Sequence, residues 1–499
     1  MRGRVKSTRQ PFDTEPGPGP CTLPAEKLMK PKTAPRAAAA AVVAAILAAP
    51  AAPAFALDLL QAWREALAND AQVASARSQL DATRERVPQA RSQLLPAVGA
   101  TAGMNRTRVD PNRGPDRSFT SEAYAIQLSV PLLSLPEQQA WEQSKLAVGI
   151  AEAQYAQAQQ DLILRVSRTY FDVLAAQDNL ETIRAQKRAI TEQLEAAKRN
   201  FEVGTATITD QQEAQARFDL AVAQEIAAIN ALDVQRALLA QLIGRPTGAL
   251  DALRRGVLLQ PPQPASEAEW VRQATDNSLA VQQQRVNIEI ARREIERRRY
   301  AKYPTVDLVG SLARNENAAL NAIGLRTNSA TVGVQLSVPL YTGGGIEAGV
   351  REAAALLDRS QSDLETTRRQ VEQATRQAYL GVNSSLAQVS ALEAAERSSQ
   401  LALESNLLGY QVGVRINIDV LNAQQQLFST RRDLARARYD VLVNGLQLKS
   451  TAGVLDEADV VAVDALLAPP PASTPGGSPQ APSSAPLPPP TTSSPPVRR

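Results

Sequence analysis

The sequence FEVGTATITD at residues 201–210 is matched by YQVGVRINID at residues 410–419. The two stretches lie 209 residues apart, and the same spacing links Tyr170 to Tyr379 without a gap. Nearer the N-terminus the spacing is 208 residues, because QLSVPL occurs at residues 127–132 and again at residues 335–340. We therefore interpret most of the chain as a tandem duplication of about two hundred residues, far longer than the ~20–50-residue units of solenoid proteins.

The first 56 residues have the pattern of a secretory leader. A basic, proline-rich start is followed by an apolar run at residues 37–49 and by Ala-Phe-Ala at residues 54–56, after which we predict cleavage. The part before Met29 is long for a signal peptide, so Met1 and Met29 are alternative translation starts. A membrane anchor is the weaker interpretation, because the run is shorter than the ~18–20 apolar residues that span a bilayer.

Charge and residue usage argue against several protein classes. The leader holds eight of the 54 basic and three of the 51 acidic residues, which leaves a net charge of −2 for the rest of the chain. The remaining charges alternate in sign instead of clustering, so we predict no nucleic-acid partner. Cys21, the only cysteine, lies in the leader outside any lipidation context, so we predict neither disulfides nor a lipid anchor.

No catalytic constellation is visible in the sequence. Histidine, the commonest metal ligand and general base, is absent. The glycines at residues 343–345 are not followed by the Lys-Ser/Thr of a phosphate loop, and a strand-to-helix turn explains them better. We therefore predict that the protein is not an enzyme and has no catalytic, cofactor-binding or metal-binding residues.

Each half is predicted to contain a pair of strands. In the first half, a helix at residues 57–93 that Pro88 kinks or interrupts leads into two strands on either side of a polar tip at residues 110–118. Tyr124, Ile126 and Leu128 alternate with small or polar residues, which gives one apolar face. The second half repeats this hairpin at residues 304–315 and 330–340, so each chain is expected to contribute four strands.

Each half is also predicted to contain a long helix and a shorter return helix. The long helices occupy residues 136–202 and 346–408, and about 66 residues at 1.5 Å each make a rod of roughly 100 Å. Glycine-containing turns lead into return helices at residues 210–242 and 419–452.

We therefore divide the chain into four parts. Residues 1–56 are the leader, residues 57–250 the first repeat, residues 251–467 the second repeat, and residues 468–499 a proline- and serine-rich tail that is predicted to be disordered.

Four strands cannot close into a barrel, and an open sheet edge in lipid leaves backbone groups unpaired. No segment after the leader has an apolar run long enough to suggest a membrane helix, so we expect strands from several copies to close a barrel. The predicted fold class is a mixed α+β membrane protein, in which long helical hairpins form a helical barrel and four strands per protomer contribute to a transmembrane β-barrel.

These features resemble the TolC family of outer-membrane channel proteins. The resemblance rests on the leader, the repeated QLSVPL, the FEVG and YQVG turns, and four further stretches: LLP at 94–96, ITD at 208–210, IDVLNAQQQL at 418–427 and ARYDVLVNGLQLKSTAGVL at 437–455. It covers approximately residues 57–467. It implies a homotrimer in the outer membrane of a Gram-negative cell, with a twelve-stranded barrel in contact with lipid and a twelve-helix periplasmic tunnel.

The resemblance also implies partners and site residues. A periplasmic adaptor would connect the channel to an inner-membrane ABC, RND or MFS pump, for drug efflux or type I protein secretion. Tyr410 and Arg415 are expected to hold the tunnel closed by contacts to Thr209 and Asp210. Asp419 is expected to form an acidic ring at the aperture. The turns are expected to contact the adaptor. Asn422 occupies the second aperture position. The turn residues expected to contact the adaptor are Val203, Gly204, Val412 and Gly413.

Simpler interpretations of these residues remain open. Asn422 stands where the enterobacterial pattern has a second acid, so a double acidic ring is not expected. Asp210 and Asp419 each precede a helix, where Asp is a favoured N-cap, and Glu213 would complete a capping box with Asp210. Arg415 has Ala206 at the matching position of the first repeat, which favours a special role for the arginine.

Two functions therefore remain. The leading one is a passive export duct that partners open, and the alternative is a secreted periplasmic coiled-coil scaffold without a pore. The paired amphipathic strands argue against the scaffold. The sequence leaves the cargo, the pump, the adaptor and the role of the tail open.

Overall fold

The computed structural model describes residues 57–110, 112, 115–254 and 256–469. The predictions for the leader and for residues 470–499 of the tail lie outside the described residues.

A helical arm of three segments opens the described chain: α2 (Leu59–Asn69), α3 (Ala71–Arg84) and α4 (Arg86–Ser92). The sequence predicted one helix that Pro88 kinks or interrupts. The structure divides the arm at Asp70, whose side chain accepts a hydrogen bond from the Val73 backbone N–H at 2.8 Å, and again at Glu85. Pro88 consequently lies in the first turn of α4, where its missing N–H has no helical partner to lose.

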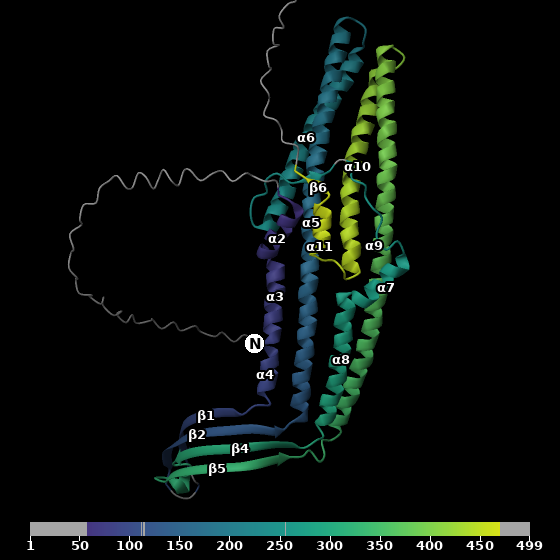
Figure 1. The fold of residues 1–499 in the computed structure, drawn as a ribbon. Helices are drawn as coiled ribbons and strands as arrows, with labels where there is room; N and C mark the ends of the chain where they lie inside the picture. Colours follow the sequence, from purple (N-terminus) through teal and green to yellow (C-terminus); the bar gives the residue numbers. More distant parts are fainter. Residues whose placement is uncertain (1–56, 111, 113–114, 255, 470–499) are drawn as a thin grey trace, which may run out of the picture. The chain divides into compact units, whose positions relative to one another are not determined.

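Four antiparallel strands form one sheet, as predicted (Figure 1). They are β1 (Ala97–Val109), β2 (Arg117–Leu133), β4 (Thr305–Glu316) and β5 (Arg326–Ser337), in the spatial order β1-β2-β4-β5. Pairing of β2 with β4 joins the two hairpins, and β1 and β5 form the two edges of the sheet.

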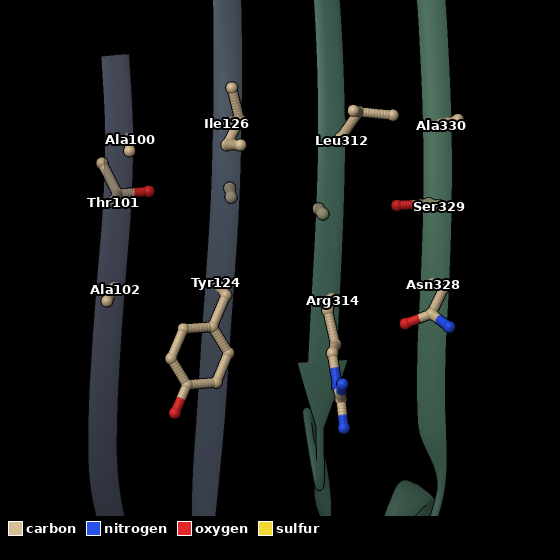
Figure 2. Close-up of a pocket in the computed structure, with 12 residues that line it drawn as sticks. Ala100, Thr101, Ala102, Tyr124, Ile126, Leu312, Arg314, Asn328, Ser329 and Ala330 are labelled. Carbon is tan, nitrogen blue, oxygen red and sulfur yellow. The ribbon is translucent and has the colours of Figure 1, made fainter.

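The two faces of the sheet differ in polarity. In the register of the sheet, Ile126 lies between Ala100 and Leu312, and Leu312 lies opposite Ala330. Figure 2 shows this row, and beside it the next row on the same face, formed by Ala102, Tyr124, Arg314 and Asn328. Large exposed apolar side chains share this face: Val98, Met104, Tyr124, Ile126, Leu312, Val332, Val334 and Leu336. The other face is mostly small or polar, with Thr101, Gln127, Ser311 and Thr331 among its residues.

Two long helical hairpins extend from the sheet (Figure 1). In the first, α5 (Leu135–Glu202) packs against α6 (Ile208–Ile243); in the second, α9 (Gly345–Gln411) packs against α10 (Asn417–Thr451). The long helices contain 68 and 67 residues, close to the predicted rods. Helix α10 also packs along α5, which connects the two hairpins.

Shorter elements complete the described fold. Helices α7 (Glu267–Asn277) and α8 (Leu279–Tyr300) precede β4, η1 (Leu320–Ala322) lies between β4 and β5, and α11 (Glu457–Asp464) follows α10. Strand β3 (Ala252–Leu253) pairs with β6 (Leu467–Ala468). The ordered fold therefore includes Ala468, the first residue of the predicted tail.

A buried aromatic group joins α5 to α10 in the main core. Tyr170 is fully buried and donates its hydroxyl to the carbonyl oxygens of Leu57 at 2.9 Å and Asp251 at 3.0 Å. Phe171 stacks on Tyr439 of α10, whose hydroxyl donates to Asp178 at 2.7 Å. Burial raises the pKa of both Tyr170 and Tyr439. The packing of α10 on α5 thus depends on residues from both halves of the sequence.

Helix α6 corrects one expectation. Among the described residues it alone is long and apolar enough by composition to cross a membrane. Polar residues interrupt the apolar ones along this alanine-rich helix, so it contains no unbroken apolar run. Composition and length are weak evidence for a span, and α6 packs along α5.

Glu294 on α8 predicts a specific acid sensitivity. Burial raises the pKa of this carboxyl, but hydrogen bonds from Arg297, Gln143 and Arg298 outweigh burial and lower the pKa to about 2 from 4.5. Because the folded pKa is the lower one, the stabilisation is complete above pH 4.5 and is lost as the pH falls towards 2. Thermal unfolding of the detergent-solubilised protein is expected to depend less on pH in this window for Glu294→Gln than for wild type.

The control for this prediction is Glu296→Gln. Glu296 forms an exposed pair with Arg299 at 2.9 Å on the same helix, and exposed pairs contribute little. An identical pH dependence in wild type and both variants would contradict the role given to Glu294.

Candidate functional site

The turns of both hairpins lie at the end of the long helices away from the sheet (Figure 1). They are built alike. The Thr205 backbone N–H donates to the Asn200 carbonyl at 2.8 Å, and the Val414 N–H donates to the Gly409 carbonyl at 2.9 Å. A glycine with φ near +77° follows each long helix, a conformation that side chains disfavour. We call this end of the molecule, residues 193–217 and 409–425, the tip.

The four predicted turn residues are exposed at the tip. Val203 is 72% exposed and Val412 is 64% exposed, and Gly204 and Gly413 have φ values of 75° and 79°. Val414 and Ile416 are exposed beside them. The turns therefore present apolar surface to solvent, and contact with an adaptor remains a prediction.

The start of α6 differs from the expected capping arrangement. The N-cap is Thr207, whose hydroxyl accepts from the Asp210 N–H at 3.3 Å, while the Asp210 carboxylate accepts from the Thr207 N–H at 3.0 Å. Asp210 is therefore the third helical residue of a capping box, and the predicted box of Asp210 with Glu213 is wrong. Helix α6 begins at Ile208, two residues earlier than expected, and Thr209 is exposed in its first turn.

Asp419 is also the third residue of its helix, α10. The N-cap of α10 is Ile416, and no side chain caps this end. The Asp419 carboxylate instead lies 3.5 Å from Arg415 Nη1. A carboxylate in the first turn is favourable beside the unpaired N–H groups of a helix N-terminus.

The predicted lock residues have other partners within this chain. Arg415 pairs with Asp419, and the Tyr410 hydroxyl accepts from Asn200 Nδ2 at 3.3 Å. Among the described residues, no hydrogen bond or ion pair joins the side chains of Tyr410 or Arg415 to Thr209 or Asp210. Contacts of this kind between copies of the chain remain a prediction.

A buried amide network at the tip was missed in the sequence. Asn417 is fully buried, and its Oδ1 accepts from Gln193 Nε2 at 2.6 Å. Its Nδ2 donates to the Asp210 carbonyl at 3.2 Å. One side chain thereby joins α10 to both α5 and α6. A comparison of the two repeats could have identified Asn417, because the matching position in the first half is the apolar residue Ile208.

Arg217 of α6 makes a second polar connection to α10. Its Nη2 donates to Asn422 Oδ1 at 3.0 Å, and its Nη1 makes a short hydrogen bond to Gln425 Oε1. Asn422, predicted at the aperture, is therefore held by a cation from the other hairpin. Arg217 is not among the site residues predicted from the sequence.

A small apolar cluster is the remaining connection at this level. It consists of Leu194, Ala197, Ala214 and Leu421, with Phe218 packed against it. The tip of the second hairpin therefore depends on few apolar contacts and several polar ones. Within the residues that the structure describes, no group of three or more Cys, Asp or Glu could hold a metal ion.

Known proteins share both the sequence and the fold. The family model of outer membrane efflux proteins matches residues 62–245 and 270–454. The outer membrane protein TolC of Vibrio cholerae is 35% identical, with 82% of this chain and 94% of that protein covered. The alkaline protease secretion protein AprF of Pseudomonas aeruginosa is 34% identical, with 83% and 88% covered.

Solved structures show the same architecture. The outer membrane protein VceC of Vibrio cholerae superposes with a TM-score of 0.67 at 18% identity, covering 79% of this chain and 96% of that one. The outer membrane channel MtrE of Neisseria gonorrhoeae gives a TM-score of 0.65 at 21% identity, covering 81% and 91%. The chain therefore belongs to the outer membrane efflux protein family, and it is an outer-membrane channel protein, not an enzyme.

Proposed function

We propose that the protein is the outer-membrane exit duct of a tripartite efflux or type I secretion system, a passive homotrimeric channel. The observation that carries this proposal is the four-stranded sheet with an exposed apolar face and two free edges, β1 and β5. Backbone groups in lipid must be paired, so β5 of one copy is expected to pair with β1 of the next. Three copies would close a barrel of twelve strands.

The tandem organisation, with repeats at residues 57–250 and 251–467, is part of the proposal. It is supported by the return helices of 36 and 35 residues and by the equivalent order of strands and long helices in both halves. Trimerisation of two such repeats would place twelve helices around the axis.

The proposal includes a periplasmic adaptor and an inner-membrane pump of the ABC, RND or MFS class. Val203, Gly204, Val412 and Gly413 are the proposed adaptor contacts, because they are exposed at the end farthest from the sheet. The name of AprF refers to protease secretion and that of BepC of Brucella suis to efflux, so both cargo classes fit the proposal.

We expect closure at the tip, with Asp419 and Asn422 at the aperture and Tyr410, Arg415, Thr209 and Asp210 as the lock. The test is single-channel conductance of the mature protein in planar bilayers beside an Arg415→Ser, Tyr410→Phe double variant. The variant removes the Arg415–Asp419 pair and the hydrogen bond to Asn200. Its conductance is expected to be several-fold larger than the small steps of wild type.

A matched control is Arg369→Ser, Tyr379→Phe on α9, the helix that carries Tyr410. Arg369 pairs with Glu365 and Tyr379 donates to the Ala265 carbonyl, both outside the tip. Channels of equal size in all three proteins would keep the duct and reject these lock residues. No channels from trimers verified in the membrane would reject the duct and leave the periplasmic scaffold.

A further inference from the structure

A hollow lined by three arginines lies at the loop end of the β1–β2 hairpin. Its lining residues are Arg106, Arg108, Asp116, Arg117 and Ser118, and its volume is 510 Å³. Arg108 pairs with Asp116, while no ion pair within the described part of the chain involves Arg106 or Arg117. We call these five residues the arginine hollow. Three arginines and one aspartate give it a net positive charge.

Two of these arginines belong to the apolar face of the sheet. Residues two apart on a strand point to the same side, so Arg106 and Arg108 share the face of Val98 and Met104. Arg106 lies four residues, or about 13 Å, beyond Ala102, whose row also contains Tyr124. By the same alternation, Arg117 lies on the opposite face, at the rim of the hollow.

Two side chains in the row of Ala102 show on which side of the sheet the polar surroundings begin. The Arg314 side chain extends along β4 away from Leu312, towards the loop end (Figure 2). The Tyr124 hydroxyl points the same way and hydrogen-bonds to Glu122 Oε2 at 3.3 Å. Long cationic and aromatic side chains at the edge of a lipid-facing band direct their polar ends to the headgroups. The arginine hollow therefore lies on the headgroup side of the band.

The next row limits where an anion can bind. Glu122 lies directly opposite Glu316, which pairs with Arg326 at 2.9 Å. This row has a net negative charge and repels anions. On β1 and β2, the positive charge of the lipid-facing side therefore lies in the hollow, about one row farther out.

We propose that the arginine hollow binds the phosphate groups of lipid headgroups in the leaflet that surrounds the loop end of the sheet. Guanidinium groups bind phosphate oxygens through paired, charge-assisted hydrogen bonds. The proposal rests on the proposed function, because it requires the apolar face to contact lipid. Since β1 is an edge strand, the hollow lies at the seam between copies, and a bound lipid would bridge two protomers.

The test uses the mature trimer in nanodiscs of a neutral phospholipid, with and without a phosphorylated glycolipid such as lipid A. The phosphorylated lipid is expected to raise the temperature at which the trimer dissociates on a gel. Arg106→Gln, Arg108→Gln is expected to lose most of this shift, because each of the two lost charge-assisted contacts weakens binding about tenfold. Arg359→Gln, a 75%-exposed side chain on α9, is the matched control and should respond like wild type.

Three results would overturn the proposal. One is equal stabilisation of wild type by the phosphorylated glycolipid and its dephosphorylated form, which needs no variant. Another is stabilisation of the double variant by the phosphorylated glycolipid to the same extent as wild type. If the double variant does not form trimers, Arg106→Gln alone is tested in its place. The third is full stabilisation by free inorganic phosphate, which would make the hollow an anion site without a lipid. Trimers and channels that persist in all of these experiments would leave the proposed function intact.

Discussion

Asn417→Ala is expected to increase single-channel conductance several-fold and to lower the stability of the closed tip. The Asn417 side chain is fully buried and is the only one seen in the described residues to bridge α10 to both α5 and α6 by hydrogen bonds. Its loss leaves the Gln193 amide and the Asp210 carbonyl without this partner. Each buried polar group left unpaired costs about 1–3 kcal/mol.

The expected opening follows from how the second hairpin is attached. At the tip, α10 is held by this network, by Arg217 and by the small apolar cluster around Leu421. Farther along, α10 packs on α5 through the larger core that includes Phe171. Weakening the tip alone should therefore release the end of the hairpin while the rest of the fold remains in place.

Asn444→Ala is the matched control, because Asn444 is also on α10 and donates to Ser385 Oγ at 3.1 Å, far from the tip. Conductance in planar bilayers and trimer dissociation temperature should be measured on both variants. A less stable trimer with wild-type conductance in Asn417→Ala would show that the network is structural only. Equal conductance increases in both variants would show that general loosening of α10, and not the tip, opens the pore.

The fold could be predicted because its signals are periodic and repeated. Alternation around Ile126 gave the strands and their apolar face, and proline-free helical stretches gave the rods to within a few residues. The duplication strengthened these predictions, because the strand pair, the long helix and the return helix each occur twice. Closure across copies, which the free edges of a four-stranded sheet predict, remains a prediction.

The tip was predicted less well because its contacts join distant parts of the chain. Asn417 looks like an ordinary polar residue at a helix start, and its burial depends on Gln193, 224 positions away. The prediction that Asp210 is the N-cap of α6 was wrong for a local reason. Thr207 and Asp210 are both good N-cap residues three positions apart, and the sequence does not reveal which one leaves the helical conformation.

Arg217→Gln is expected to increase the cation selectivity of the channel. Arg217 holds Asn422, which lies one helical turn after Asp419. Each protomer therefore places a cation from α6 close to the proposed acidic aperture. In the closed trimer three such cations would offset three aspartates, so their removal leaves the aperture more negative.

Asn422→Asp provides the complementary change. The new carboxylate would take the place of the Asn422 oxygen that accepts from Arg217 Nη2, which forms an ion pair and neutralises the arginine. The two single variants change the charge equally and are expected to raise cation selectivity by similar amounts. The double variant Arg217→Gln, Asn422→Asp adds an unpaired acid per protomer and should give the largest increase.

Reversal potentials in a salt gradient measure this series, with Arg184→Gln as control, since Arg184 lies on α5 outside the tip and pairs with Glu225. The differences should shrink as salt rises, because charges are screened over about 10 Å at 0.1 M ionic strength. If Asn422→Asp alters selectivity but Arg217→Gln does not, the arginine lies away from the ion path. Its bonds to α10 would then serve only to hold the two hairpins together.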